Sequence, residues 1–174
     1  RRSFDAIRAA KARGLPISCE ASPHHALLNV EACASGDPNT KMNPPLRSEA
    51  DRQAVVEAIV DGTVDAFATD HAPHSAEEKS RGFLDAPFGV IGLETAFSAL
   101  LTLVHDGSIS VNRAVELMTS SPAKVIGLEG QVGTVVGESA PKHLCLVDPS
   151  HEWTVSTDHF HGLSSNSAFI GHAF

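Results

Sequence analysis

The chain has 174 residues, of which 42% are hydrophobic and 20% charged, and its formal net charge is −8. A chain of this length and composition can bury a core and suits one domain or a large part of one, which excludes intrinsic disorder as the default. The negative charge argues against binding to nucleic acid or to an anionic membrane surface, and no apolar run approaches the roughly 20 residues of a membrane span. A soluble, cytoplasmic protein is the simplest expectation.

The first part of the chain alternates between helix and strand patterns. Apolar residues recur at helical spacing up to Gly14, which predicts a helix already under way at the first residue. Residues 15–21 and 64–68 are short apolar runs typical of buried strands, and a helix capped by Ser48 is predicted between them. This order of elements is that of repeated βα units and predicts a parallel α/β sheet or barrel.

The later part of the chain changes in character. Helices are predicted over residues 94–105, from Ser110 through Met118, and from Ser121 to Gly127, after a polar surface loop or frayed turn at residues 75–82. From residue 130 onward, short apolar runs at 133–137, 143–149 and 152–155 are separated by Gly and Pro, which predicts strands of a small sheet. We therefore expect an α/β part over residues 1–129 and part of a small β-domain over residues 130–174.

Three polar side chains directly follow the second predicted strand, in the heptapeptide Ala-Thr-Asp-His-Ala-Pro-His at residues 68–74. In a parallel α/β sheet or barrel the chemistry gathers at the C-terminal ends of strands, so Asp70, His71 and His74 are candidates for a metal or proton-transfer site. The structural alternative is a turn in which Asp70 makes only local hydrogen bonds. The three cysteines have no Cys-x-x-Cys spacing, so neither a disulfide framework nor a structural zinc site is indicated.

Two further motifs precede the heptapeptide and one follows it. They are Cys-Glu-Ala-Ser-Pro-His-His at residues 19–25, Lys-Met-Asn-Pro-Pro-Leu-Arg at 41–47, and Ala-Pro-Phe-Gly at 86–89. In this order and spacing the set closely resembles the dihydroorotases of the amidohydrolase superfamily, in particular the monofunctional bacterial type. The resemblance covers essentially the whole chain. It implies the C-terminal part of a (β/α)8 TIM-like metallo-dependent hydrolase barrel over residues 1–129, followed by the start of a small β-sandwich domain.

The resemblance also implies a role for five residues. Asp70 would be a zinc ligand and the general acid/base, two duties that suit a carboxylate because its oxygens can both bind Zn²⁺ and move a proton. Asn43 and His74 would hold the substrate's carboxylate, and the backbone around Phe88 and Gly89 would contact its pyrimidine ring. These donors would supply the local attraction for an anionic substrate that the net charge does not.

Other residues of the motifs are weaker candidates. Some relatives use the position of Glu20 for an extra metal contact, and a buried strand-end carboxylate paired to a neighbour explains it about as well. We expect His71, His24 and His25 to support the site through hydrogen bonds rather than ligate the metal. Arg47 could neutralise the substrate, although pairing with a carboxylate at the start of the next helix is favoured.

The implied activity is the zinc-dependent, reversible cyclisation of N-carbamoyl-L-aspartate to L-dihydroorotate in pyrimidine biosynthesis, at a binuclear zinc site. The family's zinc-binding His-x-His, its bridging carboxylated lysine or aspartate and its two later histidines match nothing in this chain and would precede Arg1. We therefore expect a C-terminal fragment that is inactive, and that self-associates, when it is separated from the complete protein.

Two alternatives stay open at this point. One is another cyclic amidohydrolase, such as an allantoinase or dihydropyrimidinase, which shares the barrel and the strand-end aspartate. The other is a non-catalytic dihydroorotase-like subunit that serves as a scaffold for a carbamoyltransferase partner. A homodimer is compatible with each of these functions.

Overall fold

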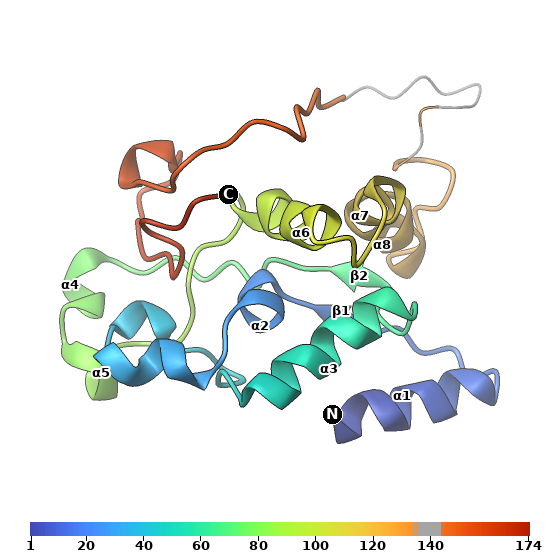
Figure 1. Ribbon diagram of the computed structural model, residues 1–174, viewed down its shortest axis with the longest axis horizontal. Helices are drawn as coiled ribbons and strands as arrows, with labels where there is room; N and C mark the ends of the chain where they lie inside the picture. The colour runs from blue at the N-terminus through green and yellow to red at the C-terminus, as the bar shows by residue number, and fades with distance from the viewer. Residues whose placement is uncertain (134, 136–143) are drawn as a thin grey trace.

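A computed structural model describes residues 1–133, 135 and 144–174 of the chain (Figure 1). It confirms the predicted alternation of helix and strand in the first part of the chain. The elements there are α1 (Arg2–Ala12), β1 (Glu20–Ala21), α3 (Glu49–Val60) and β2 (Ala66–Phe67), and β1 pairs with β2 in parallel. Ser48 caps α3 as predicted, its side chain accepting a hydrogen bond from the backbone N–H of Asp51.

Both strands are shorter than the apolar runs that predicted them. The Asp65 carboxylate accepts a hydrogen bond from the Cys19 N–H at 2.8 Å, so a side chain replaces the backbone partner at this end of the ladder. Lys11 donates to the same carboxylate oxygen at 2.6 Å and ties α1 to the start of β2. At the other end, the last backbone bond joins the Ala68 N–H to the Ala21 carbonyl at 2.9 Å. Beyond this hydrogen bond the two strand segments separate, just before Ser22 and Asp70.

The segment between β1 and α3 contains α2 (Pro23–Leu27) and two 3₁₀ helices, η1 (Val30–Ser35) and η2 (Pro38–Thr40). Helix α2 begins immediately after β1 because Pro23 occupies its first turn, where a missing backbone N–H has no helical partner to lose. This places His24 and His25 on a helix at the strand's exit.

Among the described residues, five α-helices follow β2, namely α4 (Ala76–Lys79), α5 (Gly82–Asp85), α6 (Ala96–His105), α7 (Val111–Met118) and α8 (Ser120–Val125). Residues 75–82 were predicted to be a surface loop or a frayed turn, and the structure has the short helix α4 there. Ser75 and Glu78 form a capping box that satisfies free N–H groups at the start of this short helix.

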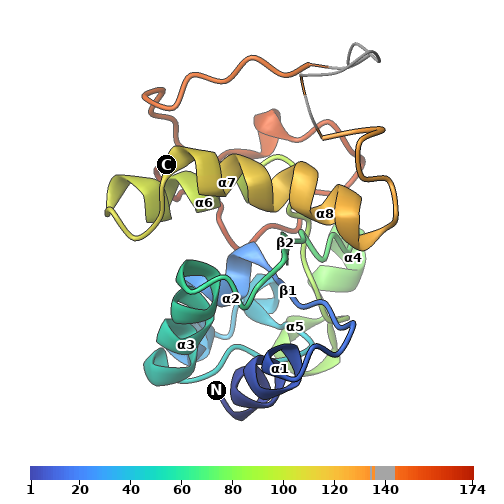
Figure 2. The same cartoon turned by 90° about the vertical axis from the view of Figure 1, so that its right-hand side faces the viewer.

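The strand pair lies between two groups of helices, with α1 and α3 on one side and α6, α7 and α8 on the other (Figures 1 and 2). Apolar side chains from all these layers meet in one core, which includes Ile59 of α3, Phe67 of β2, Leu100 of α6 and Leu117 of α7. Each such side chain contributes about 1.5–3 kcal/mol when fully buried. The core therefore fixes the direction in which both strands exit.

The C-terminal segment packs against α6 and contains the 3₁₀ helix η3 (Thr157–His159). Trp153 Nε1 donates to Ser98 Oγ at 3.1 Å, and Thr154 forms an antiparallel bridge with Ala173.

The strand expected over residues 143–149 is not present in its described part, 144–149, and the run at 133–137 falls largely outside the described residues. The domain boundary at residues 129 and 130 stays a prediction. No helix in the described part of the chain is long and apolar enough to span a membrane.

Candidate active site

Asp70 is the residue at which the backbone turns away from β2. Its φ is 51°, and among the described residues it is the only one other than glycine with a positive φ. This left-handed conformation costs roughly 1–2 kcal/mol for most side chains and is tolerated best by Asp and Asn. The Asp70 side chain is 55% exposed. A strained, exposed carboxylate at a strand end is typical of a functional site.

A cleft of about 810 Å³ opens at the ends of both strands and brings the predicted motifs together. Asp70 and Asn43 both line it, so residues of two separate motifs lie in one cleft. Glu20 also lines the cleft and is exposed, so a buried ion pair does not explain it. Arg47 lies 3.8 Å from Asp51 at the start of α3, which agrees with the favoured pairing there.

The histidine pair on α2 forms a hydrogen-bonded chain through Ser22. His25 Nε2 lies 2.9 Å from the Pro44 carbonyl oxygen, which can only accept, so Nε2 carries the hydrogen. In the neutral ring, His25 Nδ1 then accepts a hydrogen bond from the Ser22 hydroxyl, whose Oγ is 2.6 Å away. Ser22 Oγ in turn accepts from His24 Nε2 at 3.1 Å. This series of hydrogen bonds is compatible with the expected supporting role of both histidines, and it holds the Asn43 segment against α2.

His24 is the buried end of this chain and the one closest to Asp70. Burial, followed by the neighbouring His25, lowers the pKa of His24 to about 3. The ring is therefore neutral near pH 7, and its contact with Asp70 Oδ2 at 3.8 Å is a polar contact rather than an ion pair. His71, on the other side of Asp70, accepts a hydrogen bond at Nδ1 from the Gly92 N–H at 3.2 Å.

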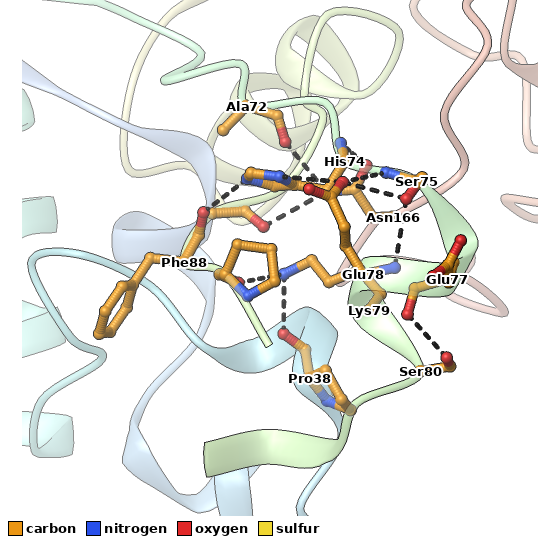
Figure 3. Close-up of polar contacts among 12 residues, drawn as sticks. Pro38, Ala72, His74, Ser75, Glu77, Glu78, Lys79, Ser80, Phe88 and Asn166 are labelled. Atoms are coloured by element: carbon orange, nitrogen blue, oxygen red, sulfur yellow. Dashed lines mark hydrogen bonds and ion pairs between the residues drawn. The ribbon is translucent and has the colours of Figure 1, made fainter. Parts of the chain in front are cut away.

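The other predicted substrate residues form a neighbouring cluster and do not line the cleft. His74 Nε2 donates to the Phe88 carbonyl oxygen at 3.0 Å, and in Figure 3 the His74 ring points toward Phe88. The Gly89 N–H donates to the Lys41 carbonyl at 2.8 Å, which joins this cluster to the motif that contains Asn43. The substrate roles of Asn43, His74, Phe88 and Gly89 stay predictions.

Sequence reasoning missed three side chains that hold this cluster in place. They are Lys41, whose Nζ lies 4.6 Å from the centre of the Phe88 ring, the buried Lys79, and Asn166 of the C-terminal segment. Lys41 belongs to a motif and could have been found there. Asn166 lies 92 residues beyond His74, and no spacing or motif marked it.

Among the described residues, Asp70 is the predicted zinc ligand. No group of three or more His, Cys, Asp or Glu side chains in the described part of the chain could hold a metal ion. Asp70, exposed in the cleft and free of strong ion pairs, fits as a single carboxylate ligand. A zinc site at Asp70 therefore requires further donors from outside the described residues.

The Amidohydrolase family model matches residues 2–164. The chain belongs to this amidohydrolase family. The dihydroorotase of Elusimicrobium minutum (strain Pei191) is 47% identical over 170 residues, which cover 97% of this chain and 39% of the relative. That of Citrifermentans bemidjiense is 44% identical over 171 residues, which cover 95% and 38%.

Solved amidohydrolase structures show the same fold. The L-hydantoinase (dihydropyrimidinase) of Arthrobacter aurescens superposes with a TM-score of 0.90 at 30% identity, over 98% of this chain and 38% of that one. A D-hydantoinase (dihydropyrimidinase) of Thermus sp. gives 0.87 at 28% identity, over 99% and 39%. The predicted fold class is confirmed, and the chain forms part of an amidohydrolase TIM-like barrel. It spans less than two fifths of the length of these relatives, between 38% and 39%.

Proposed function

We propose that the complete protein is a dihydroorotase, which interconverts N-carbamoyl-L-aspartate and L-dihydroorotate in pyrimidine biosynthesis. The observation that carries the proposal is that Asp70 and Asn43 lie in one cleft, in a chain 47% identical to a dihydroorotase across nearly its whole length. The solved hydantoinase structures are less similar in sequence, at 28–30% identity.

The cleft residues have the chemistry that this reaction needs. Asp70 presents an exposed carboxylate that can take a proton from the attacking water and return it to the departing ring nitrogen. The Asn43 amide can donate to the substrate's carboxylate, and the hydrogen bond from His25 to Pro44 holds its segment in place.

Zinc is the proposed metal, with Asp70 as one ligand among others that come from outside the described residues. When bound, zinc supplies Lewis acidity at the ring carbonyl that is attacked. The buried, neutral His24 lies beside Asp70, with its Nε2 atom 3.8 Å from Asp70 Oδ2.

The test is a substrate comparison with the complete, zinc-loaded protein. We expect kcat/KM for L-dihydroorotate to exceed that for dihydrouracil, hydantoin and allantoin by a factor on the order of 10² or more, because a site with a donor for a carboxylate leaves that donor unpaired with a ring that lacks one. A preference for hydantoin or dihydrouracil would instead support the hydantoinase alternative, which the TM-score of 0.90 favours on fold alone. No turnover of any ring would support the scaffold alternative.

The remaining predictions concern the setting of the enzyme. A homodimer, a carbamoyltransferase partner and a cytoplasmic location are each compatible with a dihydroorotase and stay predictions. Size-exclusion chromatography of the complete protein, alone and with the carbamoyltransferase of the same organism, would test the first two.

A further inference from the structure

Residues 86–89, which form the substrate loop of the proposed site, are held by four side chains, one for each successive carbonyl group. Lys41 Nζ donates to the Ala86 carbonyl at 2.7 Å, and Lys79 Nζ donates to the Pro87 carbonyl at 3.0 Å. His74 Nε2 donates to the Phe88 carbonyl at 3.0 Å, and Asn166 Nδ2 donates to the Gly89 carbonyl at 3.3 Å. An irregular loop whose carbonyls are all bound by side chains has little freedom to move.

Two of the four donors are buried, which makes their contribution strong. Lys79 is only 7% exposed, and its Nζ also donates to the Pro38 carbonyl at 3.0 Å, as Figure 3 shows. Burial lowers the pKa of Lys79, because the ammonium group loses the water that stabilises its charge. Asn166 is only 5% exposed. Removing a buried donor leaves its acceptor unsatisfied, which costs more than the loss of an exposed hydrogen bond.

Asn166 lies outside both the loop and the exit of β2, and its side chain bonds to both of them. Besides the Gly89 carbonyl, its Nδ2 donates to the Ala72 carbonyl at 2.9 Å, while its Oδ1 accepts from the His74 N–H at 3.1 Å. In Figure 3 Asn166 lies close to both Ala72 and His74. Its partners are two carbonyls and one N–H, so only one orientation of the amide satisfies them.

The backbone of Asn166 adds to this connection. Its carbonyl accepts a hydrogen bond from the Ile91 N–H at 3.0 Å, directly after the loop. The Ala72 N–H donates to the Val90 carbonyl at 2.8 Å, so the two segments that Asn166 bridges already run side by side. Asn166 fixes the distance between them at the level of His74 and Gly89.

We propose that Asn166 is a positioning residue, which sets the substrate loop against His74 and thereby determines substrate affinity. This inference rests on the proposed function, because it takes the loop and His74 to contact the substrate. Asn166 does not line the cleft that contains Asp70, so we expect its effect to fall on binding of the substrate rather than on proton transfer.

The test uses Asn166→Asp in the complete, zinc-loaded protein. The carboxylate keeps the acceptor for the His74 N–H but places negative charge against the Ala72 and Gly89 carbonyls, which pushes the loop away. We expect KM for L-dihydroorotate to rise about tenfold or more while kcat stays within about threefold of wild type. Asn166→Ser is a milder variant whose hydroxyl can replace one donor, and its KM should lie between those of the wild type and Asn166→Asp.

Ser167→Ala is the matched control. Ser167 is equally buried in the same segment, and its Oγ accepts from the Phe169 N–H at 3.2 Å without touching the loop. We expect its KM to be unchanged. If Asn166→Asp lowers kcat and the melting temperature together and leaves KM unchanged, Asn166 has only a structural role and the proposal is wrong.

Hydrogen–deuterium exchange provides a readout that does not depend on the substrate. In Asn166→Asp, faster exchange confined to peptides covering residues 72–74 and 86–91 supports the proposal, whereas unchanged exchange there, or faster exchange throughout the protein, overturns it. If the wild type turns over no dihydroorotate, the proposed function fails, and this exchange pattern alone decides whether Asn166 positions the loop.

Discussion

Asp70 combines a strained backbone with an exposed carboxylate, and the two properties can be tested separately. Asn adopts left-handed backbone about as readily as Asp, whereas Ala does not. Replacing Asp70 with Asn therefore removes the charge while keeping the conformation, and replacing it with Ala removes both.

We predict that Asp70→Asn in the complete protein lowers kcat by about 10²–10⁴ with little change in melting temperature, because it removes a proton-transferring metal ligand without straining the backbone. Asp70→Ala should lose as much activity and also lower the free energy of unfolding by about 1 kcal/mol. Steady-state kinetics and thermal unfolding would measure both effects. Wild-type turnover in Asp70→Asn would show that another group transfers the proton.

Gly89 is the residue of the substrate loop that most needs to be glycine. Its φ is +97°, and a Cβ added to it would lie 2.6 Å from the Ala72 Cβ. Gly107, in the turn after α6, has a similar φ of +80° and open space around it. Alanine at these two positions separates the cost of a positive φ, which both share, from the cost of the contact with Ala72, which only Gly89 has.

We predict that Gly89→Ala destabilises the complete protein by about 1–3 kcal/mol more than Gly107→Ala, because only Gly89→Ala forces two segments apart. KM for the substrate should rise in Gly89→Ala and stay at the wild-type value in Gly107→Ala. Denaturant unfolding and steady-state kinetics provide the measurements. Equal destabilisation by the two variants would mean that Ala72 moves without cost.

At the scale of the elements, side-chain hydrogen bonds support the N-terminus of α3. Glu49 in its first turn accepts hydrogen bonds from Arg52, Asn29 and Gln53, so one carboxylate links the helix to the preceding segment. These bonds, led by the one from Arg52, lower the pKa of Glu49 to about 2. A carboxylate near a helix N-terminus is also favoured by the helix dipole.

We predict that Glu49→Gln lowers the melting temperature of the complete protein at pH 7. Since the folded-state pKa lies below the ordinary value of 4.5, the stabilisation is complete above pH 4.5 and is lost as the pH falls toward 2. The difference from wild type should therefore shrink steadily below pH 4.5. Glu57→Gln, an exposed position on the same helix, is the control, and a difference at Glu49 that does not depend on pH would contradict the assignment.

The elements were predictable from the sequence where a local rule determined them. The predicted helix starts after Ser48 (α3) and Ser110 (α7), and the predicted helix ends at glycines, were correct because capping depends on neighbouring residues. The strand lengths were not predictable, since β1 begins only after Cys19, whose N–H is bound by the carboxylate of Asp65 instead of a backbone partner. That contact joins residues 46 positions apart.

The same distinction holds for the site. The resemblance of the motifs implied that Asp70 and Asn43 belong to one site, and both residues line one cleft. The separation of His74 from that cleft did not, since it depends on a hydrogen bond to Phe88. Asn166 was invisible to sequence reasoning because its three partners lie between 77 and 94 residues away and follow no period.

At the scale of the whole molecule, the described chain contains a sheet of only two strands. A two-stranded sheet has two open edges, and such a pair is marginally stable in water without further packing. Large apolar side chains are also exposed, among them Leu84 at 86% and Leu93 at 60%. The layers of Figure 2 therefore have few of the contacts that stabilise a closed barrel.

We predict that the 174 residues expressed alone self-associate. Light scattering coupled to size-exclusion chromatography should show species well above 18.3 kDa, and a dye that binds exposed apolar surface should fluoresce strongly. The complete protein under the same conditions is the control. A monodisperse species of 18.3 kDa with cooperative unfolding would contradict this prediction.

The four donors that hold residues 86–89 come from four separate parts of the chain, at positions 41, 74, 79 and 166. If this loop alone were replaced by that of a relative with a different ring substrate, its carbonyl groups would face donors whose positions fit the original loop backbone. Exchange of specificity between relatives therefore requires the loop and its donors to be transferred as one unit, including a residue from the far end of the chain. A loop graft without position 166 should fold and bind neither substrate well.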